Sequence, residues 1–119
     1  MLYIFLLYKD WSLPEPPNVM EQHETVTARA QGRDGYICSA GLESFTSATT
    51  VRVRAGKAAV TDGPFAETKE VLGGIYVLDC VDLDDALEYA KQIPDARFGA
   101  VEVRPIKYPE EAWLKPARP

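Results

Sequence analysis

The spacing of hydrophobic residues changes several times along the chain, and each spacing predicts an element of secondary structure. Residues 2–8 are apolar at odd and even positions alike, which predicts a strand that is covered on both faces. Residues 49–54 alternate polar and apolar side chains and predict a half-exposed strand. A turn at Gly56, where a positive φ is expected, joins this strand to a second one and predicts a hairpin. Further strands are expected at 36–40, 58–61, 74–80 and 99–104.

Two segments carry the spacing of an amphipathic helix. The first runs over residues 18–31, with acids early and Arg29 late, as the helix dipole favours. The second begins after Asp82, a good N-cap residue, and ends at Pro94. Its expected buried stripe consists of Leu83, Ala86, Leu87, Ala90 and Ile93.

The resulting element order, β-α-β-(hairpin)-β-α-β, predicts a ferredoxin-like α+β fold, an antiparallel sheet with two helices on one face. Two helices leave the other sheet face uncovered, although the strand at residues 2–8 is apolar on both faces. A second copy of the same sheet is the simplest cover. We therefore expect a homodimer.

Composition narrows the class of protein. The 119 residues suit one domain, and a net charge of −5 argues against nucleic acid as a partner, because phosphate binding needs clustered Lys and Arg. The apolar start, residues 2–7, is too short for a membrane span and lacks the basic flank of a signal peptide. Cys38 and Cys80 are not spaced as a metal or redox pair, so we expect two buried reduced thiols and a cytoplasmic protein.

The single histidine, His23, is the first candidate for chemistry. It falls among Val19, Met20, Val26 and Ala30, in the middle of the apolar stripe of the first helix. One interpretation is a core histidine that is satisfied by a hydrogen bond. The other is a general acid or base that faces a cavity between the helix and the sheet. One histidine does not support a multi-histidine metal site, and no cofactor motif is present, so no cofactor is expected.

The loop after the hairpin is the second candidate. Asp62, Gly63, Pro64 and Phe65 make either an ordinary stiff turn or a loop that directs the Asp62 carboxylate and the Phe65 ring at a ligand. Lys69 and Arg97 would supply positive charge to an anionic ligand, or else are solvated surface charges.

Several motifs resemble those of the YCII-related proteins, in particular the branch named for its Asp-Gly-Pro-Phe sequence. They are the stretch from Asp62 to Gly74, the preceding run 50–57, and the closing runs 96–99 and 101–105. The resemblance covers residues 1–106 and leaves a C-terminal tail at 107–119, in which Trp113 is the expected anchor. It implies a dimeric α+β barrel, a bacterial origin and a genomic association with extracytoplasmic-function sigma factors.

The resemblance also implies a catalytic pair in one branch of the family. That pair is a histidine on the first helix, matched here by His23, and an aspartate just before a proline near the end of the second helix. In this chain Ile93 precedes Pro94, and Asp95 follows it. If the pair exists here, its acid is Asp62 or Asp95.

Two functions follow as hypotheses. The first is an enzyme-like pocket in which His23 transfers a proton, with lyase-like or dehalogenase-like chemistry on a small aromatic or carbonyl compound. The second is a non-catalytic homodimeric module that binds a metabolite or meets a sigma factor. Catalysis requires an acid near His23 in a cavity, whereas the binding module does not.

Overall fold

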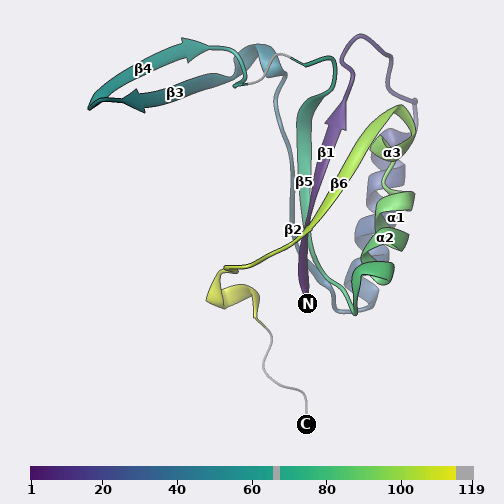
Figure 1. Ribbon diagram of the computed structural model, residues 1–119. Helices are drawn as coiled ribbons and strands as arrows, with labels where there is room; N and C mark the ends of the chain where they lie inside the picture. The colour runs from purple at the N-terminus through teal and green to yellow at the C-terminus, as the bar shows by residue number, and fades with distance from the viewer. Residues whose placement is uncertain (66–67, 115–119) are drawn as a thin grey trace.

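The protein is an α+β structure with one four-stranded antiparallel sheet and a separate two-stranded hairpin, as a computed structural model shows (Figure 1). The structure describes residues 1–65 and 68–114, so Ala66 and Glu67 of the family-like motif and residues 115–119 of the tail lie outside the description. The strands are β1 (Leu2–Lys9), β2 (Tyr36–Gly41), β3 (Thr49–Arg54), β4 (Lys57–Asp62), β5 (Val71–Asp79) and β6 (Gly99–Pro105). The helices are α1 (Val19–Gly32), α2 (Leu83–Gln92) and α3 (Asp95–Phe98), with short 3₁₀ turns η1 (Phe45–Ser47) and η2 (Glu111–Trp113).

The large sheet has the strand order β2-β5-β1-β6, and the helices cover one of its faces (Figure 1). Side chains of β1 alternate between the two faces. Tyr3, Phe5 and Leu7 are buried in the core under the helices, together with Leu78 of β5. Ile4 and Leu6 point the other way, where Ile4 is opposite Val77 of β5. The first strand is therefore apolar on both faces, as its sequence predicts, and no described helix covers the second face.

The helices depart from the sequence prediction in two respects. A third helix, α3, follows Pro94 directly, because the proline ends α2 and provides the N-cap for a new short turn. The buried stripe of α2 is also rotated, since Tyr89 is 1% exposed whereas Leu83 and Leu87 are 49% and 38% exposed. Tyr89 fills the core position because its hydroxyl reaches the Arg33 side chain at the helix end, at 3.1 Å.

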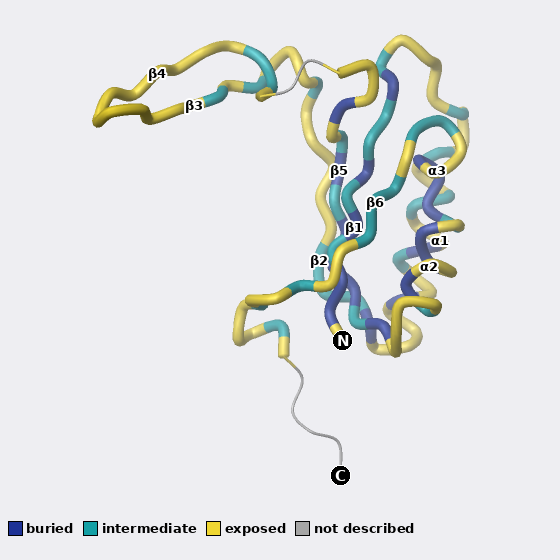
Figure 2. The backbone as a smooth tube through the Cα atoms, viewed as in Figure 1, coloured by how far each residue is buried: buried dark blue, intermediate teal, exposed yellow. Residues whose placement is uncertain are grey.

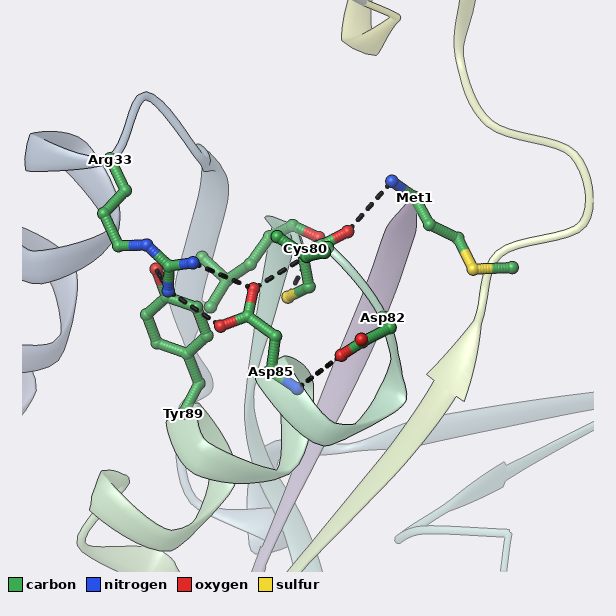
Figure 3. Close-up of polar contacts among 8 residues, drawn as sticks. Met1, Arg33, Cys80, Asp82, Asp85 and Tyr89 are labelled. Atoms are coloured by element: carbon green, nitrogen blue, oxygen red, sulfur yellow. Dashed lines mark hydrogen bonds and ion pairs between the residues drawn. The ribbon is translucent and has the colours of Figure 1, made fainter.

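A network of polar contacts joins the end of α1 to the start of α2 (Figure 3). The Asp82 carboxylate accepts a hydrogen bond from the Asp85 backbone N–H at 2.9 Å, which confirms the predicted N-cap. The Asp85 carboxylate in turn accepts two hydrogen bonds from the Arg33 guanidinium, at 2.8 and 3.2 Å. These contacts hold the Asp85 pKa below its usual value, first through the Arg33 hydrogen bond.

Strands β3 and β4 form the predicted hairpin, but they make a sheet of their own rather than joining the large one. Gly56 has the expected positive φ of 75°, and Ala55 beside it has a φ of 50°. Every residue of β4 is exposed, and so is nearly all of β3 (Figure 2). The hairpin therefore contributes little to the core.

The two cysteines are unlinked, as expected, but they differ in burial. Cys80 is buried, and desolvation raises its thiol pKa to about 12. Cys38 is only half-buried, contrary to the expectation for both thiols, because β2 is an edge strand of the sheet. Within 1–65 and 68–114, no helix combines the length and apolar character needed to cross a bilayer.

Candidate active site

A cavity of about 640 Å³ lies between α1 and the sheet, next to the end of β2 and the start of β5. Its apolar lining includes Leu7, Val19, Met20, Leu42, Ile75 and Phe98. Its polar lining includes His23, Thr27, Ser39, Tyr76 and Asp95. The cavity explains why the first half of the α1 stripe is not buried: Val19 and Met20 border this space, while Val26 and Ala30 further along pack in the core.

His23 lies on α1 with its ring directed at β5, because it shares the inward face of the helix with Val26 and Ala30. Its Nδ1 atom is 2.6 Å from the Tyr76 hydroxyl, and the two rings are stacked with centroids 5.8 Å apart. The His23 side chain keeps 24% exposure, so one edge remains open to the cavity. Tyr76 therefore fixes the orientation of the imidazole.

Asp95 brings a carboxylate to the other ring nitrogen. Its Oδ1 atom is 3.4 Å from His23 Nε2, and its side chain is 7% exposed. The contact is close enough for an ion pair but lacks hydrogen-bond geometry, so Oδ1 is buried without a hydrogen-bond partner in the part of the chain that the structure describes. Asp95 takes this position because α3 begins immediately after Pro94 and turns its first residue toward α1.

Tyr76 is a weak acid in this setting. Its burial raises the pKa to about 12, the negative charge of Asp95 adds to the rise, and a hydrogen bond with Thr27 opposes it. The phenol thus keeps its proton at neutral pH, and a hydroxyl both donates and accepts. When Tyr76 donates to Nδ1, His23 carries its proton on Nε2, facing Asp95. When Tyr76 accepts from Nδ1, Nε2 is free to take a proton.

Two of the other predicted site residues, Asp62 and Phe65, do not line the cavity beside His23. Asp62 ends β4 of the hairpin, and Phe65 follows it with 72% exposure and the Arg52 guanidinium 4.6 Å from its ring centre. Gly63 has the unusual φ expected of it, 101°, and its carbonyl accepts a hydrogen bond from the Thr50 hydroxyl at 2.8 Å. The loop is thus pinned to its own hairpin, on the far side of the sheet from the helices (Figure 1).

The two predicted cations also have other partners. Lys69 Nζ lies 3.7 Å from Asp10 Oδ2 with its side chain 84% exposed. Arg97 donates to Gln22 Oε1 at 3.2 Å and borders a smaller hollow of about 370 Å³ beside α1. Neither cation is part of the described lining of the large cavity, and the same holds for Asp62 and Phe65. Of the candidates, only His23 and the alternative acid Asp95 come together.

Sequence reasoning missed Tyr76 and Thr27. The signal for Tyr76 was available. It lies two residues before the core residue Leu78 on β5, so both side chains are on the same face of the sheet, toward the helix that carries His23. Thr27 stands four residues after His23, one helical turn further along the same face.

The fold and this pocket define a small α+β protein with a histidine–carboxylate pair in a cavity. A family model for the YCII-related domain matches residues 1–110, and the chain belongs to that family. It is also similar to an uncharacterised protein of Rhizobium meliloti (strain 1021), with 41% identity over 116 residues that cover 89% of this chain and 92% of the relative.

Proposed function

We propose that the cavity binds a small organic molecule and that His23 transfers a proton to or from it, with Asp95 as the partner acid. The observation that carries this proposal is the buried Asp95 Oδ1, which lines the cavity 3.4 Å from His23 Nε2 without a hydrogen bond. A buried carboxylate oxygen without a donor is costly, and a ligand that donates a hydrogen bond to it removes that cost. Asp95 rather than Asp62 is the acid of this proposed pair.

The cavity favours a small substrate with apolar and polar parts. Its volume is in the range of small-molecule sites, with apolar walls and a few polar groups at one side. Among the described residues that line it, Lys9 is the cation, and it is already paired with Glu15, so a strongly anionic substrate is not favoured. A small aromatic or carbonyl compound suits this lining.

An elimination of the lyase or dehalogenase type uses the pair in a balanced way. The base, His23 Nε2, takes a proton from a carbon beside a carbonyl group, and the electrons of that C–H bond form a C=C bond. The leaving group departs with the electrons of its own bond to carbon. Asp95 stabilises the imidazolium that forms, and Tyr76 accepts a hydrogen bond from Nδ1 throughout.

The test is a panel of small carbonyl compounds, including ones with a halogen on the carbon next to the acidic C–H group, incubated with the protein in D₂O. Deuterium incorporation at carbon or halide release, measured by mass spectrometry and ion chromatography, should occur with the wild type and be lost in His23→Gln. Asp95→Asn should be impaired by about a hundredfold or more, and Asp62→Asn should match the wild type. Equal turnover by the wild type and His23→Gln would contradict the proposal.

A second candidate is a binding or regulatory module that uses the same cavity without catalysis. The 3.4 Å separation favours it, because Asp95 Oδ1 can then accept a hydrogen bond from a bound ligand instead of from His23. Compounds that bind but are never turned over would support this module, whether or not the module is linked to a sigma factor.

We further propose a cytoplasmic homodimer that packs open sheet faces together as a dimeric α+β barrel, within the Asp-Gly-Pro-Phe branch of the family. The strand order β2-β5-β1-β6 is that of a ferredoxin-like sheet, and the apolar, helix-free face supports the pairing. The Asp62–Phe65 sequence supports the branch. Light scattering should give twice the 13.2 kDa chain mass, and an interface on the order of 2,000 Å² is expected.

A further inference from the structure

The β3–β4 hairpin has one apolar face, and that face is exposed. Val51 is paired with Val60 across the hairpin, and Val53 is paired with Ala58. Because paired residues and every second residue share a face, these four side chains lie together. The three valines are 61%, 65% and 57% exposed for Val51, Val60 and Val53, respectively.

The hairpin extends from the body of the protein without support from other strands. It shares no hydrogen-bonded edge with the large sheet, and an isolated two-stranded ribbon is marginally stable in water. The radius of gyration is 16.3 Å, whereas a compact domain of this length has one of about 13.5 Å, and both the hairpin and the segment after β6 extend from the body (Figure 1). The chain thus keeps a ribbon with one apolar face outside its own core.

The direction of the hairpin points to what covers it. Figure 1 shows the hairpin leaving one end of the large sheet on the side opposite the helices. On that side lies the open sheet face, where Leu6 is opposite Ile75. An apolar ribbon that overhangs an apolar sheet face is placed to reach around anything that packs on that face.

The charge of the hairpin favours an acidic partner. Its second face and its tip carry Arg52, Arg54 and Lys57, in a chain whose net charge is −5. The rest of the chain is accordingly more acidic than the whole. A second copy of the same chain therefore attracts the hairpin electrostatically and offers it apolar surface.

We propose that the β3–β4 hairpin is a dimerisation arm, whose valine face packs on a second copy of this chain while that copy returns the same contact. This inference rests on the proposed homodimer and adds a second contact surface to the sheet faces. Reciprocal exchange of an arm follows from two-fold symmetry, because each surface that one subunit offers is offered by the other as well.

Sedimentation equilibrium on the full chain tests the arm. The triple variant Val51→Thr, Val53→Thr and Val60→Thr keeps β-branched side chains of nearly the same shape but makes the face polar. Its dimer dissociation constant should rise about tenfold or more. The control Ala59→Thr lies on the opposite face of β4 and should stay within about twofold of the wild type.

The outcomes separate the arm from the dimer itself. A wild type that dimerises while the triple variant dimerises equally well overturns the arm and leaves the sheet-face dimer standing. A wild type that stays monomeric at roughly 100 μM overturns both. Hydrogen exchange on the unmodified chain gives a second reading: the hairpin amides should exchange more slowly at high than at low protein concentration. Equal rates across the dimerisation range overturn the arm as well.

Discussion

The proposed site depends on Asp95, and the burial of its carboxylate is energetically unfavourable. Its Oδ1 atom is buried without a hydrogen bond within the described chain, so the folded state bears the cost of desolvating a carboxylate. Replacing it with a neutral group of the same shape removes that cost. A stability gain on such a change is a mark of a residue kept for function.

We expect Asp95→Asn to leave stability unchanged or to raise it by about 1 kcal/mol, measured by urea unfolding. The control is Asp84→Asn, an exposed carboxylate in the first turn of α2, for which a change within about 0.5 kcal/mol is expected. A loss of more than about 1 kcal/mol in Asp95→Asn would show that the carboxylate is structural.

Cys80 gives a second prediction at this scale. Burial raises its pKa to about 12, so at pH 8 only about one thiol in ten thousand is ionised. A thiol reagent should modify Cys80 at the rate of global unfolding and rapidly once urea is added. Peptide mapping that finds Cys80 modified within seconds under native conditions would refute its burial.

His23 could be identified from sequence because an ionisable residue interrupted an apolar stripe. Its partner could not be assigned, because Asp62 and Asp95 are far apart along the chain and spacing alone does not bring either to the helix. Asp95 is the partner because a new helix, α3, begins directly after Pro94 and directs the Asp95 side chain toward His23. That orientation depends on tertiary packing rather than on local preference.

At the scale of elements, the junction of α1 and α2 depends on the Asp85–Arg33 pair. Asp85→Ala should cost roughly 1–3 kcal/mol, because it leaves the Arg33 guanidinium and the Val81 N–H without their acceptor. The folded state lowers the Asp85 pKa, so its contribution is present above the unfolded value of 3.8 and is lost as pH falls below it. The difference in stability between wild type and variant should therefore narrow as pH falls from 3.8 through the lower folded-state pKa.

The control for this pair is Glu88→Ala, which removes an exposed contact to Lys91 at 3.0 Å. Such surface pairs contribute little, so a change within about 0.5 kcal/mol is expected at every pH. An Asp85→Ala variant that is as stable as Glu88→Ala at pH 7 would show that the helix junction does not depend on the pair.

The elements themselves were largely predictable, and the reasons are local. The alternation of polar and apolar residues predicted β3, the N-cap residue Asp82 predicted the start of α2, and the turn at Gly56 predicted the hairpin. Burial within an element was less predictable. In α2 the spacing favours Leu83 and Leu87 as core residues. The helix is nevertheless rotated so that Tyr89 is buried, since the Tyr89 hydroxyl accepts a hydrogen bond from Arg33, the residue that follows α1.

For the whole molecule, the sequence showed that one sheet face lacks a cover but not where the hairpin would lie. The turn of a hairpin fixes how its two strands pair. The orientation of the whole hairpin relative to the large sheet depends on the connecting loops, and their sequence does not predict that orientation. The structure places the hairpin on the side of the sheet opposite the helices (Figure 1), whereas the cavity lies between α1 and the sheet.

The central claim is that the cavity beside His23 is the ligand site, and the most direct test is protein-observed NMR with a library of small aromatic and carbonyl fragments. Hits should shift the His23 ring signals and the backbone signals of Thr27 and Tyr76, and bind at least about tenfold more weakly to Asp95→Asn. Fragments that gather instead at the Asp62–Phe65 loop, or that bind Asp95→Asn as tightly as the wild type, would contradict the account.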